Sequence, residues 1–184
     1  MATAVAPPMT AEQFGQRPDP GYPEELVRGR IIRMAPPNRR HGQVCGKADR
    51  IIGGFVDEDD LGHVLSNDAG VITQRNPDTV RGADIAFYSY QRLPKGPLPP
   101  AYGPEVPELV VEVRSAGDRW PDLLTKVTEY LNAGVVVVVV LDPEARSAQI
   151  YRVDQPPRIL QEHDELTVPD LLGDFRVTVR RFFD

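Results

Sequence analysis

Residues 107–143 constrain the fold of this chain more than any other stretch. They read PELVVEVRSAGDRWPDLLTKVTEYLNAGVVVVVVLDP, in which an apolar segment is followed by a polar turn, a helical pattern and a second apolar segment. Side chains of a strand alternate between its faces, so residues 108–114 are expected to place three apolar side chains on one face. The other face then carries Glu112 and Arg114 beside Val110. These two charges are informative, because a buried charge has to be paired or put to use.

The helical pattern that follows has clear boundaries. Asp118 is expected to be the N-cap, Pro121 fits a first turn, and Gly134 is expected to end the helix. The apolar stripe of this helix comprises Leu124, Val127 and Leu131. Residues 135–141 are a continuous apolar run, which is typical of a strand covered on both faces. The whole stretch therefore predicts a βαβ crossover with parallel strands and a right-handed connection.

Composition narrows the classes of function. With 184 residues the chain fits one domain, and we expect a flexible lead at residues 1–9 and a single domain at residues 10–184. A formal charge of -6 argues against uniform coating of nucleic acid; a local basic groove stays open, but Arg39-Arg40 is too short to count as one. Cys45 is the only cysteine, which excludes an internal disulfide and a multi-cysteine zinc site. Without a bilayer-spanning apolar run or a signal-peptide pattern, a cytoplasmic protein with no membrane partner is expected.

The rest of the chain predicts further elements around this crossover. Thr10 and Gln13 form a capping-box pattern for a short first helix, and a second helix is expected from Asn38 to about residue 56. Asn67-Asp68 is interpreted as a turn between two short strands. The expected strands outside the crossover are residues 25–27 and 30–34 as a hairpin, 62–65, 70–74, 83–89, an edge strand at 148–153, and 158–161 pairing back. The fold class is therefore α/β, a mixed β-sheet with a βαβ crossover and flanking helices.

Asp84 and Glu112 are the strongest candidates for chemistry. Each lies on an apolar strand at a position where Val or Ile would be expected. Mg²⁺ is held by one or two carboxylates together with water and phosphate, and carboxylates on two adjacent strands can supply them. A bound metal lowers the pKa of a water and neutralises charge on a phosphodiester. From the residues alone, the alternative stays open that both carboxylates face solvent or pair with a nearby arginine.

Other polar side chains near these acids have more than one interpretation. Lys126 either serves a phosphate or forms an i,i+4 ion pair with Asp122 on a solvated helix face. Arg114, two residues after Glu112 on the same strand face, can reach a phosphate held there. Cys45 and Tyr130 are interpreted as packing residues, and Trp120 as a lid on the core, with a stacking surface for a base as its alternative.

Several segments together resemble a known family. PELVVEVRS is followed by Asp122, Lys126, Tyr130, Gly134 and LDP, while EELVRGRIIRMAPPNRRHGQV lies near the start, GADIAFYS in the middle and DLLGDF near the end. In order and spacing these segments resemble the Uma-type family of restriction-endonuclease-like proteins, which belongs to the PD-(D/E)XK nuclease superfamily. The resemblance covers roughly residues 10–183.

The resemblance implies a restriction-endonuclease-like fold, with Asp84 and Glu112 as the ligands of Mg²⁺ or Mn²⁺. Two departures from the superfamily pattern are visible. Ala83 stands where the superfamily has proline, and Arg114 stands where it has lysine. Lys126 matches a lysine that the family carries on its helix.

Glu25 and His41 also match family positions. Glu25 matches a recurrent acid of the opening hairpin, which either adds a metal ligand or holds a basic residue; a surface pair with Arg28 is the alternative. His41 matches a histidine near the family's site, and its place at a helix start also fits a local polar contact.

The expected function is that of a metal-dependent endonuclease that hydrolyses phosphodiester bonds in DNA. Arginine stays protonated at any working pH whereas an amine can lose its proton, so Lys126 is expected to act at the chemical step and Arg114 in substrate binding. A homodimer would supply one site for each strand of a duplex. The alternative is a catalytically degenerate nucleic-acid or protein binding module on the same fold, which the acidic composition and the two departures favour.

Overall fold

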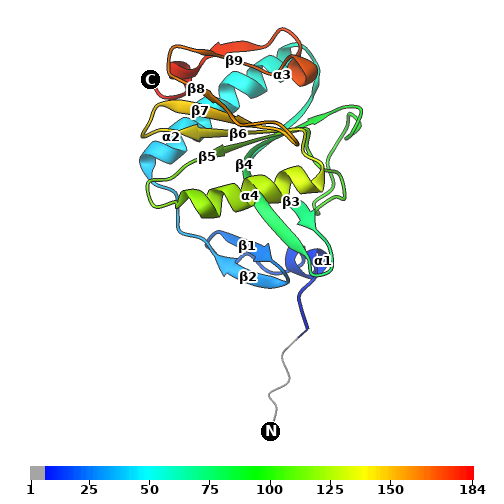
Figure 1. The fold of residues 1–184 in the computed structure, drawn as a ribbon. Helices are drawn as coiled ribbons and strands as arrows, with labels where there is room; N and C mark the ends of the chain where they lie inside the picture. Colours follow the sequence, from blue (N-terminus) through cyan, green and yellow to red (C-terminus); the bar gives the residue numbers. More distant parts are fainter. Residues whose placement is uncertain (1–6) are drawn as a thin grey trace.

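The strands of the structure are built around the predicted crossover (Figure 1). The computed structural model describes residues 7–184, so residues 1–6 of the predicted N-terminal lead lie outside the described residues. The strands of the large sheet are β1 (Glu24–Val27), β2 (Arg30–Arg33), β3 (Gly62–Gln74), β4 (Thr79–Ser89), β5 (Leu109–Val113), β6 (Val137–Asp142), β7 (Ser147–Tyr151) and β8 (Arg158–Leu160). They follow the order β2-β1-β4-β5-β6-β7-β8, and β3 pairs with β4 off this path. A separate two-stranded sheet joins β9 (Glu165–Thr167) to β10 (Arg176–Thr178).

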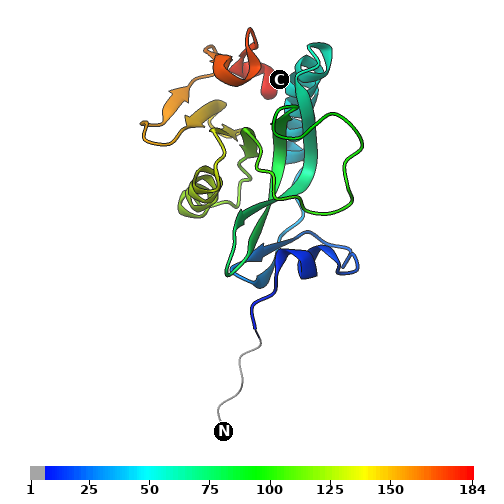
Figure 2. The same cartoon turned by 90° about the vertical axis from the view of Figure 1, so that its right-hand side faces the viewer.

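Helices cover both faces of the large sheet. The helical segments are α1 (Ala11–Gly15), α2 (Arg39–Ala48), a π-helical turn (Asp49–Gly53), α3 (Gly54–Glu58), α4 (Trp120–Ala133), α5 (Pro169–Leu172) and a 3₁₀ turn (Val179–Phe182). Figures 1 and 2 show α4 on one face of the sheet and α2 with α3 on the other. Alternate side chains of β6 pack accordingly, with Val139 in the cluster on the α2 side and Val138 in the cluster on the α4 side. The helix expected from Asn38 is confirmed with Asn38 as its N-cap, and the π-helical turn divides it into α2 and α3.

The crossover itself is confirmed. β5 and β6 run parallel with Glu112 opposite Val140, and every residue of both strands is buried. Gly134 ends α4 with a φ of 106°, a left-handed conformation that glycine adopts without a steric cost. Glu112, the charged residue of β5, is therefore carried into the interior by an apolar framework.

Three details of the predicted elements are wrong. The N-cap of α4 is Arg119, because the Asp118 carboxylate accepts a hydrogen bond from the Ser115 amide (2.8 Å) in the preceding turn. Leu124 is 39% exposed, and Leu123 is buried against the sheet in its place. β7 is not the edge of the sheet, because β8 pairs with it and takes the edge position.

Residues 62–74 form one strand rather than two. Asn67 and Asp68 have positive φ angles (64° and 58°), as turn residues often do. They form an irregularity inside β3, where the pairing with β4 shifts between Ser66 and Ala69. The predicted turn is wrong because β4 is long enough to pair with β3 on both sides of this point, so the left-handed residues bulge instead of reversing the chain.

One edge of β4 is shared by two neighbouring strands. β3 occupies the other edge along the whole length of β4. The shared edge pairs with β1 at Val80 and with β5 from Ile85 to Phe87. Residues 81–84 therefore lie in a gap between the two pairings, and the polar groups of the candidate site gather around this gap.

The N-terminal elements pack together at the lower end of the molecule in Figure 1. The predicted hairpin is confirmed as the antiparallel pair β1 and β2, and the capping box of Thr10 and Gln13 is confirmed on α1. These elements share a small apolar cluster with β3 and β4: Ala11, Phe14, Leu26, Ile72 and Val80. Across residues 7–184, no helix has the length and apolar character needed to cross a membrane.

Candidate active site

Glu112 is held by two donors from the crossover helix. Its Oε2 accepts a hydrogen bond from Lys126 Nζ and its Oε1 accepts one from the Tyr130 hydroxyl, both at 2.8 Å. Lys126 and Tyr130 are four residues apart on α4, so they share one face of the helix. Burial raises the pKa of Glu112 to about 7, although the charge of Lys126 opposes the rise. Glu112 is thus a buried carboxylate whose proton affinity is tuned by its helix partners.

Lys126 is a largely buried cation with three acceptors. Besides the bond to Glu112, its Nζ donates to the Gly82 carbonyl (3.2 Å) and lies 3.3 Å from Glu25 Oε1. The alternative ion pair with Asp122 does not form, because that residue pairs with Arg119 (2.8 Å). Burial acts to lower the pKa of Lys126, but the neighbouring carboxylates outweigh it and raise that pKa. Lys126 therefore stays an ammonium, which does not support loss of its proton at the chemical step.

Glu25 holds basic residues, which is one of the two roles expected for it. Its Oε2 pairs with Arg81 Nη1 (2.6 Å), and Arg81 Nε pairs with Glu129 on α4 (2.6 Å). Burial acts to raise the pKa of Glu25, but Lys126 and Arg81 outweigh it and lower that pKa. The alternative surface pair is wrong: within residues 7–184 the arginine that binds Glu25 is Arg81, whereas Arg28 is exposed.

Gly82 joins this network through its main chain. Its N–H donates to Glu25 Oε1 (3.2 Å), and its carbonyl accepts from Lys126. A Cβ at this position would lie 2.9 Å from the Cβ of Asp68 on β3. Glycine therefore permits the bulge of β3 to approach β4 beside the site.

Asp84 lies in the same gap and contacts α2. Its Oδ2 accepts a hydrogen bond from the Val113 amide (2.7 Å) and lies 3.4 Å from His41 Nε2. The Cys45 thiol donates to Asp84 Oδ1 (3.4 Å). Burial acts to raise the pKa of Asp84, but His41 and the Val113 amide outweigh it and lower that pKa. Asp84 is therefore ionised although it is buried.

His41 makes the local polar contact expected at the start of α2, and its side chain also lies beside Asp84. Its main-chain N–H donates to the carbonyl oxygen of the Asn38 side chain (3.0 Å), which caps α2. Its imidazole turns to Asp84, and the charge of that carboxylate raises the pKa of His41 against the opposing effect of burial.

A pocket of about 200 Å³ opens beside Asp84. Its walls include His41 and Cys45 from α2 and Asp68 from the bulge of β3, whereas Glu112 and Lys126 do not line it. Of the two predicted acids, Asp84 is therefore the one that a ligand in the pocket can contact.

The two carboxylates fit a divalent cation by their chemistry. Both supply the hard oxygen ligands that Mg²⁺ and Mn²⁺ prefer. Burial is the main cause that raises the pKa of Glu112, and the negative charge of Asp84 raises it as well. The two carboxylates are therefore close enough to repel one another. A cation shared by Asp84 and Glu112 would relieve this repulsion.

Arg114 is not brought to the Glu112 group. β5 ends at Val113, and the guanidinium of Arg114 turns toward the end of β6, where it lies 3.2 Å from Asp142 Oδ2. It also lies over the Trp120 ring (5.2 Å), which packs at the rim of the α4 cluster. Strand alternation does not extend past the end of the strand, so the expected phosphate contact of Arg114 has no support in this placement.

Four contributors to the site had no catalytic role in the sequence prediction: Cys45, Arg81, Gly82 and Tyr130. The packing roles predicted for Cys45 and Tyr130 are incomplete, because both donate to carboxylates. The sequence did hold a signal for both roles. Cys45 follows His41 by four residues and Tyr130 follows Lys126 by four, so each shares a helix face with a candidate site residue. Arg81 and Gly82 carry no such signal, because their partners come from distant elements.

A mixed sheet with a βαβ crossover, flanking helices and two buried acids on neighbouring strands defines a restriction-endonuclease-like α/β protein. The sequence matches the model of the Uma2 family, described as "Putative restriction endonuclease", over residues 11–180, and the chain belongs to this family. The fold is similar to the crystal structure of "a putative nuclease belonging to DUF820 from Anabaena variabilis ATCC 29413", with a TM-score of 0.83 and 17% sequence identity. That match covers 96% of this chain and 98% of the other. No curated protein sequence matches the chain.

Proposed function

We propose that the protein is a metal-dependent nuclease that hydrolyses phosphodiester bonds in DNA. The observation that carries this proposal is the meeting of three elements: Asp84 of β4 bonds the Val113 amide next to Glu112 of β5, and Lys126 of α4 bonds Glu112. Family membership supports a nuclease of the restriction-endonuclease-like class. Two acids and a cation at one gap in the sheet are the groups that phosphodiester hydrolysis needs.

Asp84 and Glu112 would hold the metal in this proposal. When bound there, a divalent cation supplies charge neutralisation at the phosphodiester and a lowered pKa for a water. Lys126 stays an ammonium, so its contribution is positive charge near the reacting phosphate rather than proton transfer. Tyr130 fixes the orientation of Glu112, and Glu25 of β1, which is itself paired with Arg81, holds Lys126.

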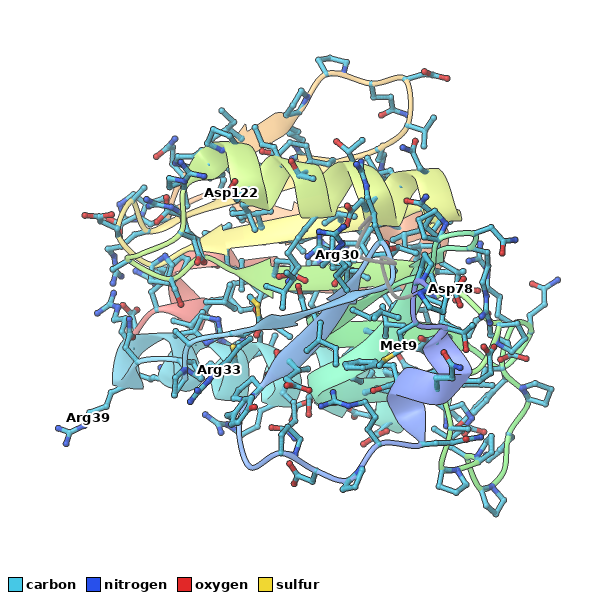
Figure 3. The ribbon with its side chains drawn as sticks, turned by 90° about the horizontal axis from the view of Figure 1, so that it is seen from below. Met9, Arg30, Arg33, Arg39, Asp78 and Asp122 are labelled. Carbon is cyan, nitrogen blue, oxygen red and sulfur yellow. The ribbon has the colours of Figure 1, made fainter. Side chains whose placement is uncertain are left out.

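The distribution of charge supports a polyanionic substrate. Although the chain is acidic overall, residues 24–50 carry seven basic side chains against three acidic ones. This segment comprises the β1–β2 hairpin and α2, which supplies His41 and Cys45 to the pocket. Figure 3 views the molecule from the hairpin side and shows Arg30, Arg33 and Arg39 spread across it. These exposed arginines can contact phosphates while the acids act in the gap.

The first test is cleavage of supercoiled plasmid DNA with Mg²⁺ or Mn²⁺. We expect wild type to produce nicked and linear products, and Asp84→Asn and Glu112→Gln to lower the rate on the order of a hundredfold or more. Asp122→Asn is the matched control, because this acid lies on α4 but pairs with Arg119 at the surface. Cleavage by Asp84→Asn at the wild-type rate would contradict the assignment of the site.

A binding module without catalysis is the second candidate. Both oxygens of Glu112 are engaged by Lys126 and Tyr130, and Arg114 faces Asp142. If wild type binds DNA but cleaves neither DNA nor RNA with Mg²⁺ or Mn²⁺, this candidate replaces the nuclease. The proposed homodimer, which would present one site to each strand, is checked by light scattering during size-exclusion chromatography.

A further inference from the structure

Three side chains of different chemistry converge beside the pocket. His41 and Cys45 are four residues apart on α2 and share one helix face, and Asp84 reaches them from β4. Within residues 7–184, they form the one group of three metal-ligating residues whose donor atoms all lie within 4.8 Å of one another. We propose that His41, Cys45 and Asp84 bind a transition-metal ion of the Zn²⁺ or Co²⁺ type.

The spacing of the donor atoms fits tetrahedral coordination. With metal bonds of about 2.3 Å to sulfur and about 2.0–2.2 Å to nitrogen and oxygen, neighbouring ligand atoms in a tetrahedron lie roughly 3.4–3.6 Å apart. Cys45 Sγ lies 3.4 Å from Asp84 Oδ1, and His41 Nε2 lies 3.4 Å from Asp84 Oδ2. Cys45 Sγ lies 3.9 Å from His41 Nε2. The two 3.4 Å contacts involve different oxygens of Asp84, and one donor atom from each residue lies within 4.8 Å of the others, so the three side chains have to draw together around one ion.

The donor set selects the class of metal. Thiolate and imidazole ligands favour Zn²⁺ and related ions, whereas Mg²⁺ prefers oxygen ligands and retains several waters. Three protein ligands leave the fourth position of a tetrahedral ion free, and the pocket lies on this side of the group. Asp68 also lines the pocket, and its negative charge adds to the attraction for a cation. On binding, the thiol proton passes to solvent as the thiolate takes its place at the metal.

This site shares Asp84 with the proposed nuclease but does not include Glu112. Both oxygens of Glu112 are bonded to Lys126 and Tyr130, and Glu112 is not among the three grouped donors. A role of this metal site in catalysis rests on the proposed nuclease function. Metal binding itself is measured without any cleavage, so the two can fail separately.

The test is titration of the intact protein with Co²⁺, followed by its absorption spectrum. Because Cys45 is the only cysteine, a thiolate-to-cobalt charge-transfer band has one source. We expect this band in wild type and its complete loss in Cys45→Ser. We also expect His41→Gln and Asp84→Asn to lower the affinity for Zn²⁺ by at least about tenfold to a hundredfold in titration calorimetry.

Asp49→Asn is the matched control, because Asp49 also lines the pocket but lies outside the donor group. We expect this variant to keep the band and the affinity of wild type. Folding of each variant is checked by its cooperative melting curve before titration. Absence of the band in wild type, or wild-type metal affinity in Asp84→Asn, would overturn the three-residue site. Loss of plasmid cleavage in Glu112→Gln with an unchanged band would leave both proposals standing.

Discussion

Lys126 binds acceptors from three strands at once: Glu112 of β5, the Gly82 carbonyl of β4 and Glu25 of β1. An ammonium group has three N–H donors, so this residue is fully satisfied although it is largely removed from water. Its two carboxylate partners are buried and depend on it differently. Glu25 retains Arg81 when Lys126 is removed, but Glu112 retains only the Tyr130 hydroxyl.

Lys126→Met is expected to destabilise the protein by about 3–5 kcal/mol, because removing one partner of a buried ion pair leaves the other uncompensated. Denaturant unfolding monitored by circular dichroism measures this change. Lys95→Met is the control: its pair with Asp60 is exposed on both sides, so its loss is expected to leave the free energy of unfolding close to that of wild type. Equal effects of the two substitutions would show that Lys126 is not a buried structural cation.

The same variant is expected to have a distinct pH dependence. The pKa of folded Glu112 is raised to about 7 from an ordinary value of 4.5, and loss of Lys126 raises it further. A raised folded pKa gives stability that is complete below the unfolded pKa and is lost as the pH rises through the folded pKa. The melting temperature of Lys126→Met should therefore fall between about pH 5 and about pH 8 by more than that of wild type. A parallel pH profile would contradict the coupling of Glu112 to Lys126.

At the scale of single residues, the sequence identified acids but not their partners. Asp84 and Glu112 could be selected because a carboxylate is unexpected on an apolar strand. The role of Arg81 could not be anticipated, because its partners Glu25 and Glu129 are distant in sequence and meet it only after the sheet and α4 have assembled. The direction of the Lys126 pKa shift likewise depends on carboxylates brought in by other elements.

Among the elements, β6 is the most sensitive to polar substitution. Its six residues are all buried, and its side chains alternate between the two main clusters. Val138→Asp is expected to abolish cooperative unfolding, because an uncompensated buried charge exceeds the marginal stability of a domain. Val153→Asp is the control, since Val153 is 55% exposed, and its melting curve should stay close to that of wild type. A native melting curve for Val138→Asp would show that this face of β6 is accessible to water.

The types of the elements were more predictable than the continuity of a strand. The crossover and the N-terminal hairpin follow from apolar periodicity and glycine positions, which are local properties of the chain. The single strand β3 was not predictable from Asn67 and Asp68, because left-handed residues are compatible with a turn and with a bulge. The partner strand decides between them, and its length is not a property of the local sequence.

Across the whole molecule, exposed arginines lie at both ends. Replacing Arg30, Arg33 and Arg39 together with Gln is expected to weaken DNA binding and to reduce the slope of log affinity against log salt by about 2–3, for a loss of three phosphate contacts. Binding is measured in Ca²⁺ across a salt series.

The matched control replaces Arg176, Arg180 and Arg181, which change the net charge equally but belong to the C-terminal segment at the opposite end of Figure 1. This control should preserve most of the salt dependence. Equal losses in the two triple variants would show that net charge, rather than the hairpin side, attracts DNA.

The gap in the shared edge of β4 has a consequence for observing the protein in solution. Beyond the last paired residues of β4 and β5, the Val113 amide is bonded to the Asp84 carboxylate instead of to a main-chain acceptor. The exchange rate and the nuclear magnetic resonance frequency of this one amide proton therefore report the charge and the contacts of Asp84 directly. This single backbone signal is therefore an internal probe of the gap between the two strands, and it needs no label attached to the site.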